Sequence, residues 1–292
     1  MRILMSGASG LVGGRLTSAL EAKGHEVKRL VRRAPASGAE VQWRIDEPPT
    51  AAVAEAEVVV NLSGAGVGDR RWTASYRREI LQSRVSATSS LAKAIAAAGH
   101  RPAFVSMSAT GFYGESHGEV FDETSPGGES FLAGVCKAWE ASADPAREAG
   151  ARVVHPRLSM VLDGKQGALP KLLLLYRLGL GGPLGGGRQR WPWISSPDAV
   201  SALAFLIEGE HEGAFNLTSP NLSTNGDFNR ELGKALHRPA LIPVPRFALG
   251  IALGGFGEEL LADQPILPAR LQSAGFTWQQ PTLAQAFAAV LR

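Results

Sequence analysis

The sequence predicts an α/β fold of the Rossmann type, a doubly wound parallel sheet with a smaller discontinuous C-terminal lobe. Three observations support this prediction. Short β-forming runs alternate with helical patterns through the first half of the chain, as in successive βαβ units. A glycine-rich turn at residues 7–13 joins the first predicted strand to the first predicted helix. Beyond Pro156 this alternation gives way to irregular segments, with Gly and Pro crowded into residues 179–192.

The predicted strands are short apolar runs bounded by turn residues. Residues 58–62 read Val-Val-Val-Asn-Leu, which is typical of a parallel strand covered on both faces, whereas residues 41–43 are the weakest candidate. In chain order the predicted strands are Arg2–Ser6, His25–Val31, Val41–Trp43, Val58–Leu62, Ala103–Ser108 and Arg152–His155.

The predicted helices show apolar residues at helical spacing. The longest is alanine-rich and ends before Gly99, because glycine is favoured just beyond a helix C-terminus. In chain order the predicted helices are Leu11–Ala22, Ala74–Ala98, Ala133–Ala149, Pro197–Ile207, Asp227–Leu236 and Leu283–Leu291. We therefore expect a sheet domain over residues 1–160, to which some later segments return, and a smaller lobe over residues 161–292.

Composition narrows the function classes. A chain of 292 residues with 45% hydrophobic and 20% charged residues is typical of a globular protein. A net charge of +3, with no basic run interleaved with aromatics, argues against nucleic acid as a partner. No segment has the ~20 apolar residues of a membrane-spanning helix. The single cysteine, Cys136, excludes an intramolecular disulfide, and Met1 leads directly into a strand. We expect a cytoplasmic protein without metal or membrane partner.

The glycine-rich turn predicts a dinucleotide site. It reads Gly7-Ala8-Ser9-Gly10-Leu11-Val12-Gly13 between a strand and an amphipathic helix. Gly7 permits a tight turn, Gly10 lets the backbone approach a pyrophosphate, and Gly13 lets the helix pack on the strand. The helix N-terminus offers free N–H groups to the phosphates. The alternative is a plain β–α turn without a ligand.

The end of the second predicted strand favours NADP(H) over NAD(H). NAD-binding proteins usually place an acidic residue there, whereas this chain has Leu-Val-Arg-Arg at residues 30–33. The guanidinium of Arg32 is suited to pair with a 2′-phosphate; the alternative is a solvated surface arginine. Asp46, after the third strand, is a candidate for the adenine amino group or, equally, a surface carboxylate.

Several motifs together resemble the extended short-chain dehydrogenase/reductases, in their NAD-dependent epimerase/dehydratase branch. They are the turn above, Asn-Leu-Ser-Gly-Ala at 61–65 and Ser-Met-Ser-Ala-Thr-Gly-Phe-Tyr-Gly at 106–114. More narrowly, Arg-Trp-Thr at 71–73, Ser83-Arg84, Val135-Cys136, Trp139-Glu140 and residues 258–276 are similar to an atypical epimerase-like subfamily of uncharacterised activity. The resemblance implies a C-terminal module from about residue 245. It also implies that Ser63, Gly64, Ala65 and Ser106 lie against the cofactor.

The chain departs from that family at the catalytic pair. Typical members use Tyr-x-x-x-Lys, in which the lysine lowers the tyrosine pKa so that tyrosinate acts as a base. Alignment on Glu140 puts Leu132 at the tyrosine position and Cys136 at the lysine position. No Tyr-x-x-x-Lys occurs anywhere in the chain, so any chemistry must use other groups.

The resemblance leaves a short set of candidates. Ser108 occupies the position of the family serine that binds a substrate oxygen, and Tyr113 lies in the family's Tyr-Gly turn; both are also suited to structural roles. Arg84 is a candidate for cofactor phosphate or an exposed helix arginine, and His155 or Arg157 for cofactor contact or the edge of the core. The segment Gly185–Ile194 offers Arg188, Arg190 and two indoles to an anionic or planar ligand, or is a loop with Trp193 packed inside.

Two functions remain open at this point. One is an NADP(H)-dependent oxidoreductase or epimerase acting on a small, anionic or neutral carbonyl compound, with Ser108 and Tyr113 as its catalytic candidates. The other is a non-catalytic NADP(H)-binding redox sensor or scaffold, which the missing Tyr/Lys pair favours. A homodimer is compatible with either function.

Overall fold

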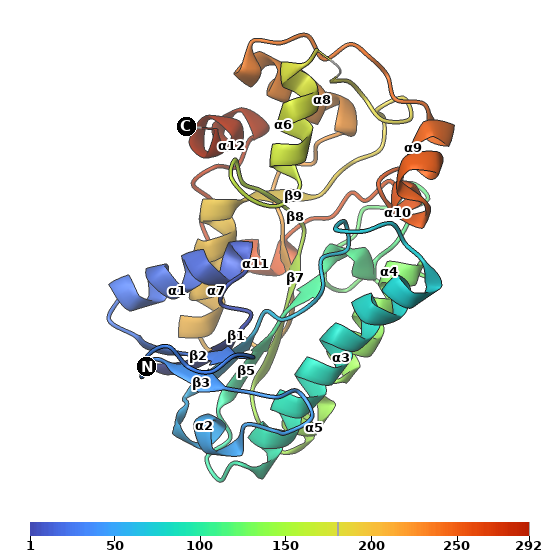
Figure 1. Cartoon of the computed structure of the whole chain (residues 1–292). Coiled ribbons are helices and arrows are strands. Elements are labelled where there is room, and N and C mark those ends of the chain that lie inside the picture. The colour runs from blue at the N-terminus through green and yellow to red at the C-terminus, as the bar shows by residue number, and fades with distance from the viewer. Residues whose placement is uncertain (180, 292) are drawn as a thin grey trace.

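The computed structural model describes residues 1–179 and 181–291 and contains an eight-stranded parallel sheet with helices on both faces (Figure 1). The strands pair in the order β10-β7-β5-β4-β1-β2-β3, with β6 beside β7. Their bounds are β1 Arg2–Ser6, β2 Glu26–Val31, β3 Glu40–Gln42, β4 Val58–Asn61, β5 Ala103–Ser106, β6 Ser108–Ala109, β7 Val153–Leu158 and β10 Gly213–Leu217. The predicted doubly wound fold is confirmed.

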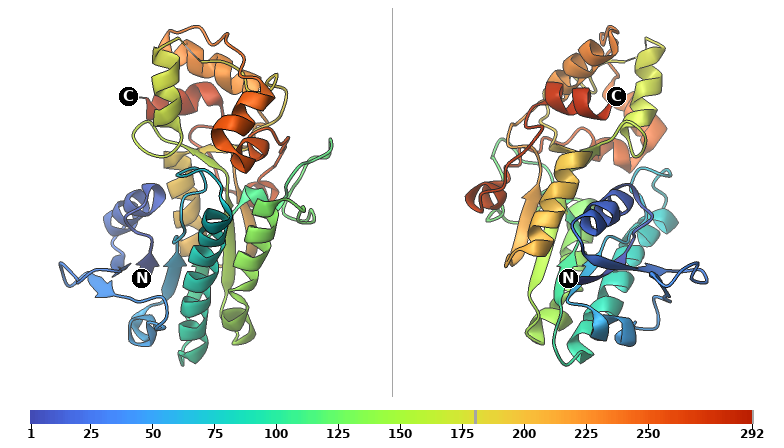
Figure 2. Two further views of the ribbon diagram at one scale, coloured as in Figure 1. Left: turned by 45° about the vertical axis from the view of Figure 1, so that its right-hand side comes forward. Right: turned by 90° about the vertical axis from the view of Figure 1, so that its left-hand side faces the viewer.

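Two groups of helices cover the sheet (Figures 1 and 2). Ile3 and Met5 of β1 face the first group, and Leu4 faces the second, because successive side chains of a strand alternate. The first group is α1 Leu11–Ala22 and α7 Ser196–Glu208. The second is α2 Thr50–Glu55, α3 Ala74–Ala97, α4 Phe131–Ala141 and α5 Asp144–Glu148. Both faces of the sheet are thus apolar and covered by helices.

The single helix predicted over Ala133–Ala149 is two helices. α4 ends at Ala141 and α5 begins at Asp144, with Pro145 in its first turn. Proline has no N–H and clashes with the preceding turn, so the helix cannot continue through it, whereas a first turn tolerates it. The predicted strand Ala103–Ser108 is likewise interrupted at Met107, between β5 and β6.

A second lobe lies above the carboxyl ends of the strands (Figure 1). It has its own core, in which Tyr176, Trp193, Phe228 and Phe287 are buried. Its elements are β8 Met160–Leu162, β9 Trp193–Ser195, α6 Leu169–Arg177, α8 Asn225–Leu236, α9 Arg246–Leu253, α10 Gly255–Glu259 and α12 Leu283–Val290, with the 3₁₀ turn η1 Thr110–Phe112 below. The short helix α11 Ala269–Ser273 packs on β10 at the edge of the sheet domain. α7 and β10 follow part of this lobe in sequence yet belong to the sheet layers.

Candidate functional site

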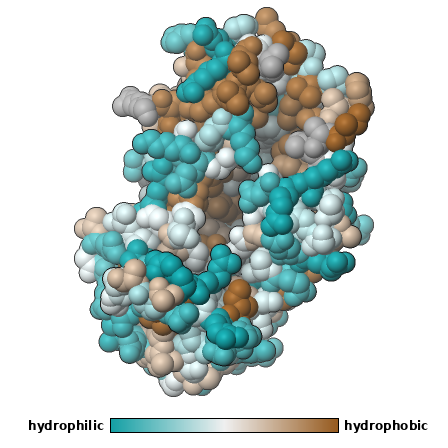
Figure 3. All heavy atoms as spheres, in the orientation of Figure 1, coloured by the Kyte–Doolittle hydropathy of each residue, from teal (hydrophilic) through white to brown (hydrophobic). Residues whose placement is uncertain are grey.

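A cleft with a volume of about 890 Å³ opens at the carboxyl ends of β1, β2 and β4, within the range of ligand pockets. Figure 3 shows the hollow between the sheet domain and the upper lobe. Four parts of the chain line it. They are the first turn (residues 7–10), the region of β2 and β3 (29–33, 40, 43 and 45), the segment after β4 (62–66, 69 and 70) and the start of α3 (Tyr76, Glu79 and Ser83). This edge is where doubly wound folds bind ligands.

The glycines of the first turn have three different surroundings. Gly7 has φ 73°, and a Cβ there would lie 2.6 Å from the carbonyl carbon of Leu62. A Cβ on Gly13 would lie 2.2 Å from the Gly7 carbonyl oxygen, so α1 packs there without a side chain. A Cβ on Gly10 would meet only the Gly7 oxygen, at 3.4 Å. The space beside Gly10 is therefore left open on the cleft side, as an approaching phosphate requires.

Of the remaining turn residues, two line the cleft and two lie outside it. Ala8 and Ser9 line the cleft, whereas Leu11 and Val12 begin α1 outside the lining, Val12 packing on the core. Gly10 is the N-cap of α1 and no side chain caps this end. The first N–H groups of α1 are thus free to bind an anion.

Basic groups gather where β2 and β3 enter the cleft. Arg33 makes a bidentate ion pair with Glu40, with both N–O distances at 2.8 Å. The hydrogen bonds from Arg33 and from the Ala36 amide lower the pKa of Glu40 to about 2. Arg32 is exposed, lines the cleft and makes no ion pair within the described part of the chain. Arg32 is therefore the guanidinium free to bind a ligand phosphate.

Two buried N–H donors in the same part of the cleft lack partners. They are Nε of Arg29 and Nε1 of Trp43, and among residues 1–179 and 181–291 neither reaches an acceptor. A buried unsatisfied donor costs about 1–3 kcal/mol, which a bound ligand with acceptor oxygens would recover. Asp46 does not line the cleft; it is exposed and pairs with Arg44, so its expected contact with adenine has no support in its position.

The segment after β4 is ordered by a buried polar network. Asn61 accepts from Ser6 Oγ at 2.7 Å and from the Ser63 amide at 3.1 Å, and its own amide donates to Thr88 at 2.8 Å. These bonds fix the backbone of Ser63, Gly64 and Ala65 along the cleft wall, where all three line the cavity. Sequence reasoning used Asn61 only as a motif letter and missed this role.

Arg84 supports this wall from behind. Its guanidinium lies 5.0 Å from the Trp139 ring centroid and donates to the Ile80 carbonyl at 2.9 Å. A Cβ on Gly64 would lie 3.1 Å from Cζ of Arg84. The side chain is thus packed beneath Gly64 and does not line the cleft, which corrects the expectation that it meets a cofactor phosphate.

A network of hydrogen-bonded polar side chains connects residues of β6, β7 and β10. Ser108 Oγ donates to Glu140 Oε1 at 2.6 Å, and Arg157 holds both Glu140 oxygens at 2.9 Å. Arg157 also donates to the Tyr113 hydroxyl at 2.9 Å, which in turn donates to Asn216 Oδ1 at 2.8 Å. This buried network, from Ser108 to Asn216, joins α4, β7 and β10.

Burial and the ion pair between Arg157 and Glu140 together determine the protonation states in the network. Arg157 and Glu140 are only 6% and 15% exposed. Burial opposes ionisation of Glu140, but the hydrogen bonds and charge of Arg157 outweigh it and lower the pKa of that carboxyl. Burial raises the pKa of Tyr113 to about 12. Tyr113 thus stays protonated with its hydroxyl bonded on both sides, and we assign it to the network instead of to proton transfer.

Packed, non-ionised side chains occupy the two positions at which the family has its catalytic tyrosine and lysine. The side chain of Leu132 covers Gly111, where a Cβ would lie 3.2 Å from Leu132 Cβ. Cys136 is buried and its thiol donates to the Ala109 carbonyl at 3.6 Å. Burial raises the pKa of Cys136 to about 12, so the thiol is neutral at physiological pH. Neither group can replace the tyrosinate or the lysine.

Ser106 and His155 lie within the sheet, outside the cleft lining. Ser106 is fully buried, and its carbonyl accepts from Nδ1 of His155 at 3.2 Å. The other nitrogen of His155 lies 3.1 Å from Nη2 of Arg147, and burial lowers the pKa of this imidazole. His155 therefore joins β5, β7 and α5, and its buried position outside the cleft lining gives no support to the expected contact with a cofactor.

The segment Gly185–Ile194 is tied to the C-terminal module instead of lining a ligand site. Arg190 donates to Asp263 through its amide and through Nε, at 2.6 and 2.9 Å, and lowers the pKa of Asp263 to about 2. Trp191 Nε1 donates to the Leu260 carbonyl at 2.9 Å, and Trp193 is buried. Of the two guanidinium groups expected here for a ligand, only Arg188 is exposed.

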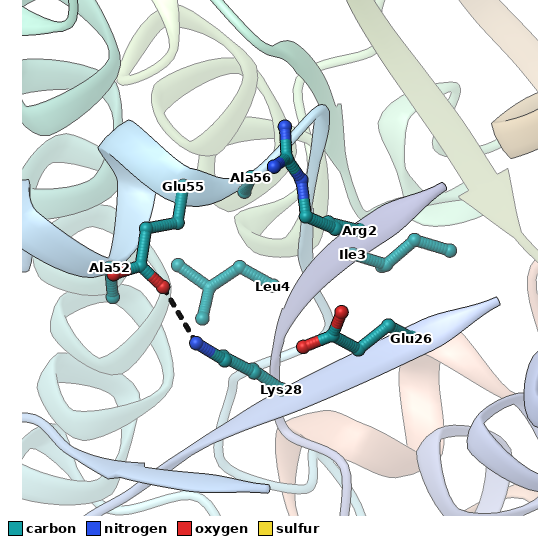
Figure 4. A pocket seen from close by; sticks show the side chains of 8 residues that line it. All are labelled: Arg2, Ile3, Leu4, Glu26, Lys28, Ala52, Glu55 and Ala56. Atoms are coloured by element: carbon teal, nitrogen blue, oxygen red, sulfur yellow. Dashed lines mark hydrogen bonds and ion pairs between the residues drawn. The ribbon is translucent and has the colours of Figure 1, made fainter.

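Other site types find no support within the described residues. No group of three His, Cys, Asp or Glu side chains there is placed to hold a metal ion. No described helix is both long and apolar enough to cross a membrane. A hollow at the opposite end of β1 and β2 has a volume of only about 20 Å³ and is crossed by the 2.6 Å ion pair of Lys28 with Glu55 (Figure 4). It has room for about one water molecule.

Comparison with known proteins adds the family. A model of the NAD dependent epimerase/dehydratase family matches residues 3–218, and one of a domain of unknown function, DUF1731, matches residues 244–290. The epimerase family protein ML0860 of Mycobacterium leprae is 40% identical over 97% of this chain and 94% of its own length. The mouse epimerase family protein SDR39U1 is 37% identical over 98% of each chain. A crystal structure of human epimerase family protein SDR39U1 (isoform 2) with NADPH has a TM-score of 0.89 at 33% identity, covering 100% of this chain and 99% of that one.

Proposed function

This chain belongs to the NAD dependent epimerase/dehydratase family, and from that premise we propose that it binds NADP(H) in the cleft and exchanges hydride with a small carbonyl compound. The open space at Gly10, facing the uncapped start of α1, is the observation that supports this most directly. The human relative with the same fold over the whole chain was crystallised with NADPH.

The residues of the cleft fit an NADP(H) molecule. The free amides at the start of α1, just after Gly10, would hold the pyrophosphate, and Arg32 the 2′-phosphate. The unpaired N–H groups of Arg29 and Trp43 give this end two further donors. Ser63 to Ala65 would border the other half of the cofactor. When bound, the nicotinamide supplies or accepts the hydride.

Proton transfer in this proposal does not use a tyrosinate. Ser108 occupies the position of the family serine, and it donates to Glu140. It would orient a substrate oxygen only after turning away from that carboxylate. The proton itself would come from water or from the substrate, because Tyr113 and Cys136 are buried with pKa values of about 12.

A binding module without catalysis is the second candidate. Leu132 and Cys136 fill the usual catalytic positions, and Ser108 does not line the cleft. The two candidates differ in one assay, which follows NADPH absorbance at 340 nm with purified protein and a panel of metabolite aldehydes and ketones. Substrate-dependent oxidation supports the enzyme. Tight NADPH binding with no oxidation across the panel supports the binding module.

Arg32→Ala should reduce the preference for NADPH over NADH. An exposed charge-assisted contact lies at the lower end of about 1.5–3 kcal/mol, or roughly tenfold in Kd. Fluorescence titration of both dinucleotides measures the ratio. Arg44→Ala is the matched control, because Arg44 is exposed beside the same edge but outside the cleft lining. An unchanged ratio in Arg32→Ala would remove the 2′-phosphate from this position.

Rebuilding the family's pair should not create activity. Leu132→Tyr with Cys136→Lys places both groups on one face of α4, since residues four apart on a helix are neighbours. We expect no NADPH oxidation and lower stability, because both sites are packed and a buried lysine is costly. NADPH oxidation by the double variant with simple ketones, absent from the parent, would contradict this and favour the binding-module function for the natural protein.

A further inference from the structure

Exposed apolar side chains gather on one part of the second lobe. Within residues 1–179 and 181–291, seven of the ten exposed large hydrophobic side chains lie in two short segments, 174–178 and 241–251, each 45% to 81% exposed. We call them the apolar rim: Leu174, Leu175, Leu178, Leu241, Ile242, Phe247 and Ile251. Figure 3 shows hydrophobic side chains gathered on this lobe above the hollow. Such a concentration marks a binding surface, because scattered single residues are the norm.

The rim lies on two helices, α6 and α9, and on the segment that leads into α9. Leu174, Leu175 and Leu178 share a face of α6 with Lys171, at helical spacings of three, four and seven. Phe247 and Ile251 are four apart on α9. The Ile242 amide donates to Gly181 at 3.1 Å, and Leu184 pairs with Val244. These contacts connect the end of α6 to the start of α9.

The rim borders the cofactor cleft. Lys171, on the rim face of α6, donates to the Gly68 carbonyl at 3.3 Å. On the α10 side of the same loop, a Cβ on Gly68 would lie 3.2 Å from Phe256. This loop, residues 64–72, supplies Gly64, Gly66 and Asp69 to the cleft lining. A ligand extending out of the cleft over this loop would therefore meet the rim.

The two segments that carry the rim bear only positive charge. The segments 168–185 and 238–253 contain Lys171, Arg177, Arg238 and Arg246 but no Asp or Glu. An apolar surface with basic residues complements a molecule that has an apolar chain and a negative charge.

We propose that the rim binds the apolar chain of the substrate, so that the substrate is an acidic carbonyl compound with an alkyl or similar apolar tail. This rests on the proposed function, because the head of the same molecule would lie beside the cofactor. It also replaces Arg190 as the source of anion preference, since Arg190 is held by Asp263.

Isothermal titration of the NADPH-saturated protein with hexanoate, octanoate and decanoate tests the proposal. Affinity should rise about fourfold for each added methylene, the value for full transfer of a CH₂ from water. Decanol should bind more weakly than decanoate. No rise with chain length, or equal binding of decanol, would overturn the proposal.

Rim variants locate the effect. Leu174→Ser with Phe247→Ser should weaken decanoate binding by about tenfold or more, since two apolar contacts are lost. Leu222→Ser is the control, because Leu222 is exposed outside the rim. NADPH affinity should be unchanged in all three proteins. If the parent protein does not bind NADPH, that result counts against the proposed function. If the double variant binds decanoate as tightly as the parent does, the rim is not the binding site of the apolar chain.

Two other molecules that could cover the rim, a second copy of the chain and a lipid membrane, are distinguished by separate experiments. Sedimentation that shows a dimer in the parent and a monomer in the rim variant would identify the rim as a self-association surface. Flotation of the parent, but not the variant, with phosphatidylglycerol vesicles would identify a membrane surface. Either result, together with chain-length-independent fatty acid binding, overturns the proposal.

Discussion

Gly10→Val should abolish NADPH binding while the protein stays folded. The side chain would project into the open space beside the phosphate-binding turn, where only the Gly7 oxygen lies within reach of a Cβ. The backbone at Gly10, φ −75° and ψ 173°, is accessible to valine, so no strain is expected. The loss should exceed about 2.7 kcal/mol, or a hundredfold in Kd.

Gly14→Val is the matched control for this variant. Gly14 lies on the exposed side of α1, and a Cβ there would make ordinary contact with the Ala8 oxygen at 3.6 Å. Circular dichroism and thermal unfolding should show both variants folded, and fluorescence titration should show NADPH binding only in Gly14→Val. Normal binding by Gly10→Val would mean that the phosphates do not lie at this turn.

Glu140→Gln should be strongly destabilising. It leaves the guanidinium of Arg157, 6% exposed, without its charge partner. Breaking one side of a buried ion pair costs about 3–5 kcal/mol. Urea unfolding followed by circular dichroism measures the change in the free energy of unfolding.

Two further variants separate the ion pair from general disturbance. Glu140→Gln with Arg157→Met removes both charges and should recover part of the lost stability, because no buried charge is then left without its partner. Glu55→Gln breaks the exposed pair with Lys28 and should leave the unfolding midpoint nearly unchanged. A Glu140→Gln midpoint equal to that of Glu55→Gln would show that the network does not stabilise the fold.

The same pair has a definite pH dependence. Arg157 lowers the pKa of Glu140 in the folded protein despite the opposing effect of burial. The stabilisation is therefore complete above the unfolded value of about 4.3 and is lost as the pH falls through the folded pKa. The difference between parent and Glu140→Gln should accordingly shrink in acid and stay constant at neutral pH.

Sequence alone predicted the sheet well because its signals are local. The run Val58–Leu62 is typical of a strand buried on both faces, and β4 occupies Val58–Asn61. The glycine turn and Arg32 were likewise found from neighbouring residues, and both line the cleft. Helix α6 escaped prediction, since the leucine run 172–175 is apolar on both sides and gives no helical period.

Long-range pairings could not be read from the sequence. Tyr113 and Asn216 are 103 residues apart, and no local pattern connects them. Arg190 was a candidate for binding an anion because it lies in a glycine-rich loop, and Arg157 was a candidate because it follows the strand that borders the cofactor in the family. Each instead meets a carboxylate from a distant segment, Glu140 or Asp263. Only the three-dimensional arrangement shows that, of these candidates, Arg32 lines the cleft without an ion pair, whereas Arg157 and Arg190 are held by carboxylates.

Isothermal titration of the unmodified protein with NADPH and, separately, NADH is the most direct test of the central proposal, an NADP(H) site in the cleft. We expect one molecule of NADPH per chain, bound at least about tenfold more tightly than NADH, because the cleft offers Arg32 where an NAD site would place an acid. Absence of heat with either dinucleotide, or tighter binding of NADH, would contradict the proposal.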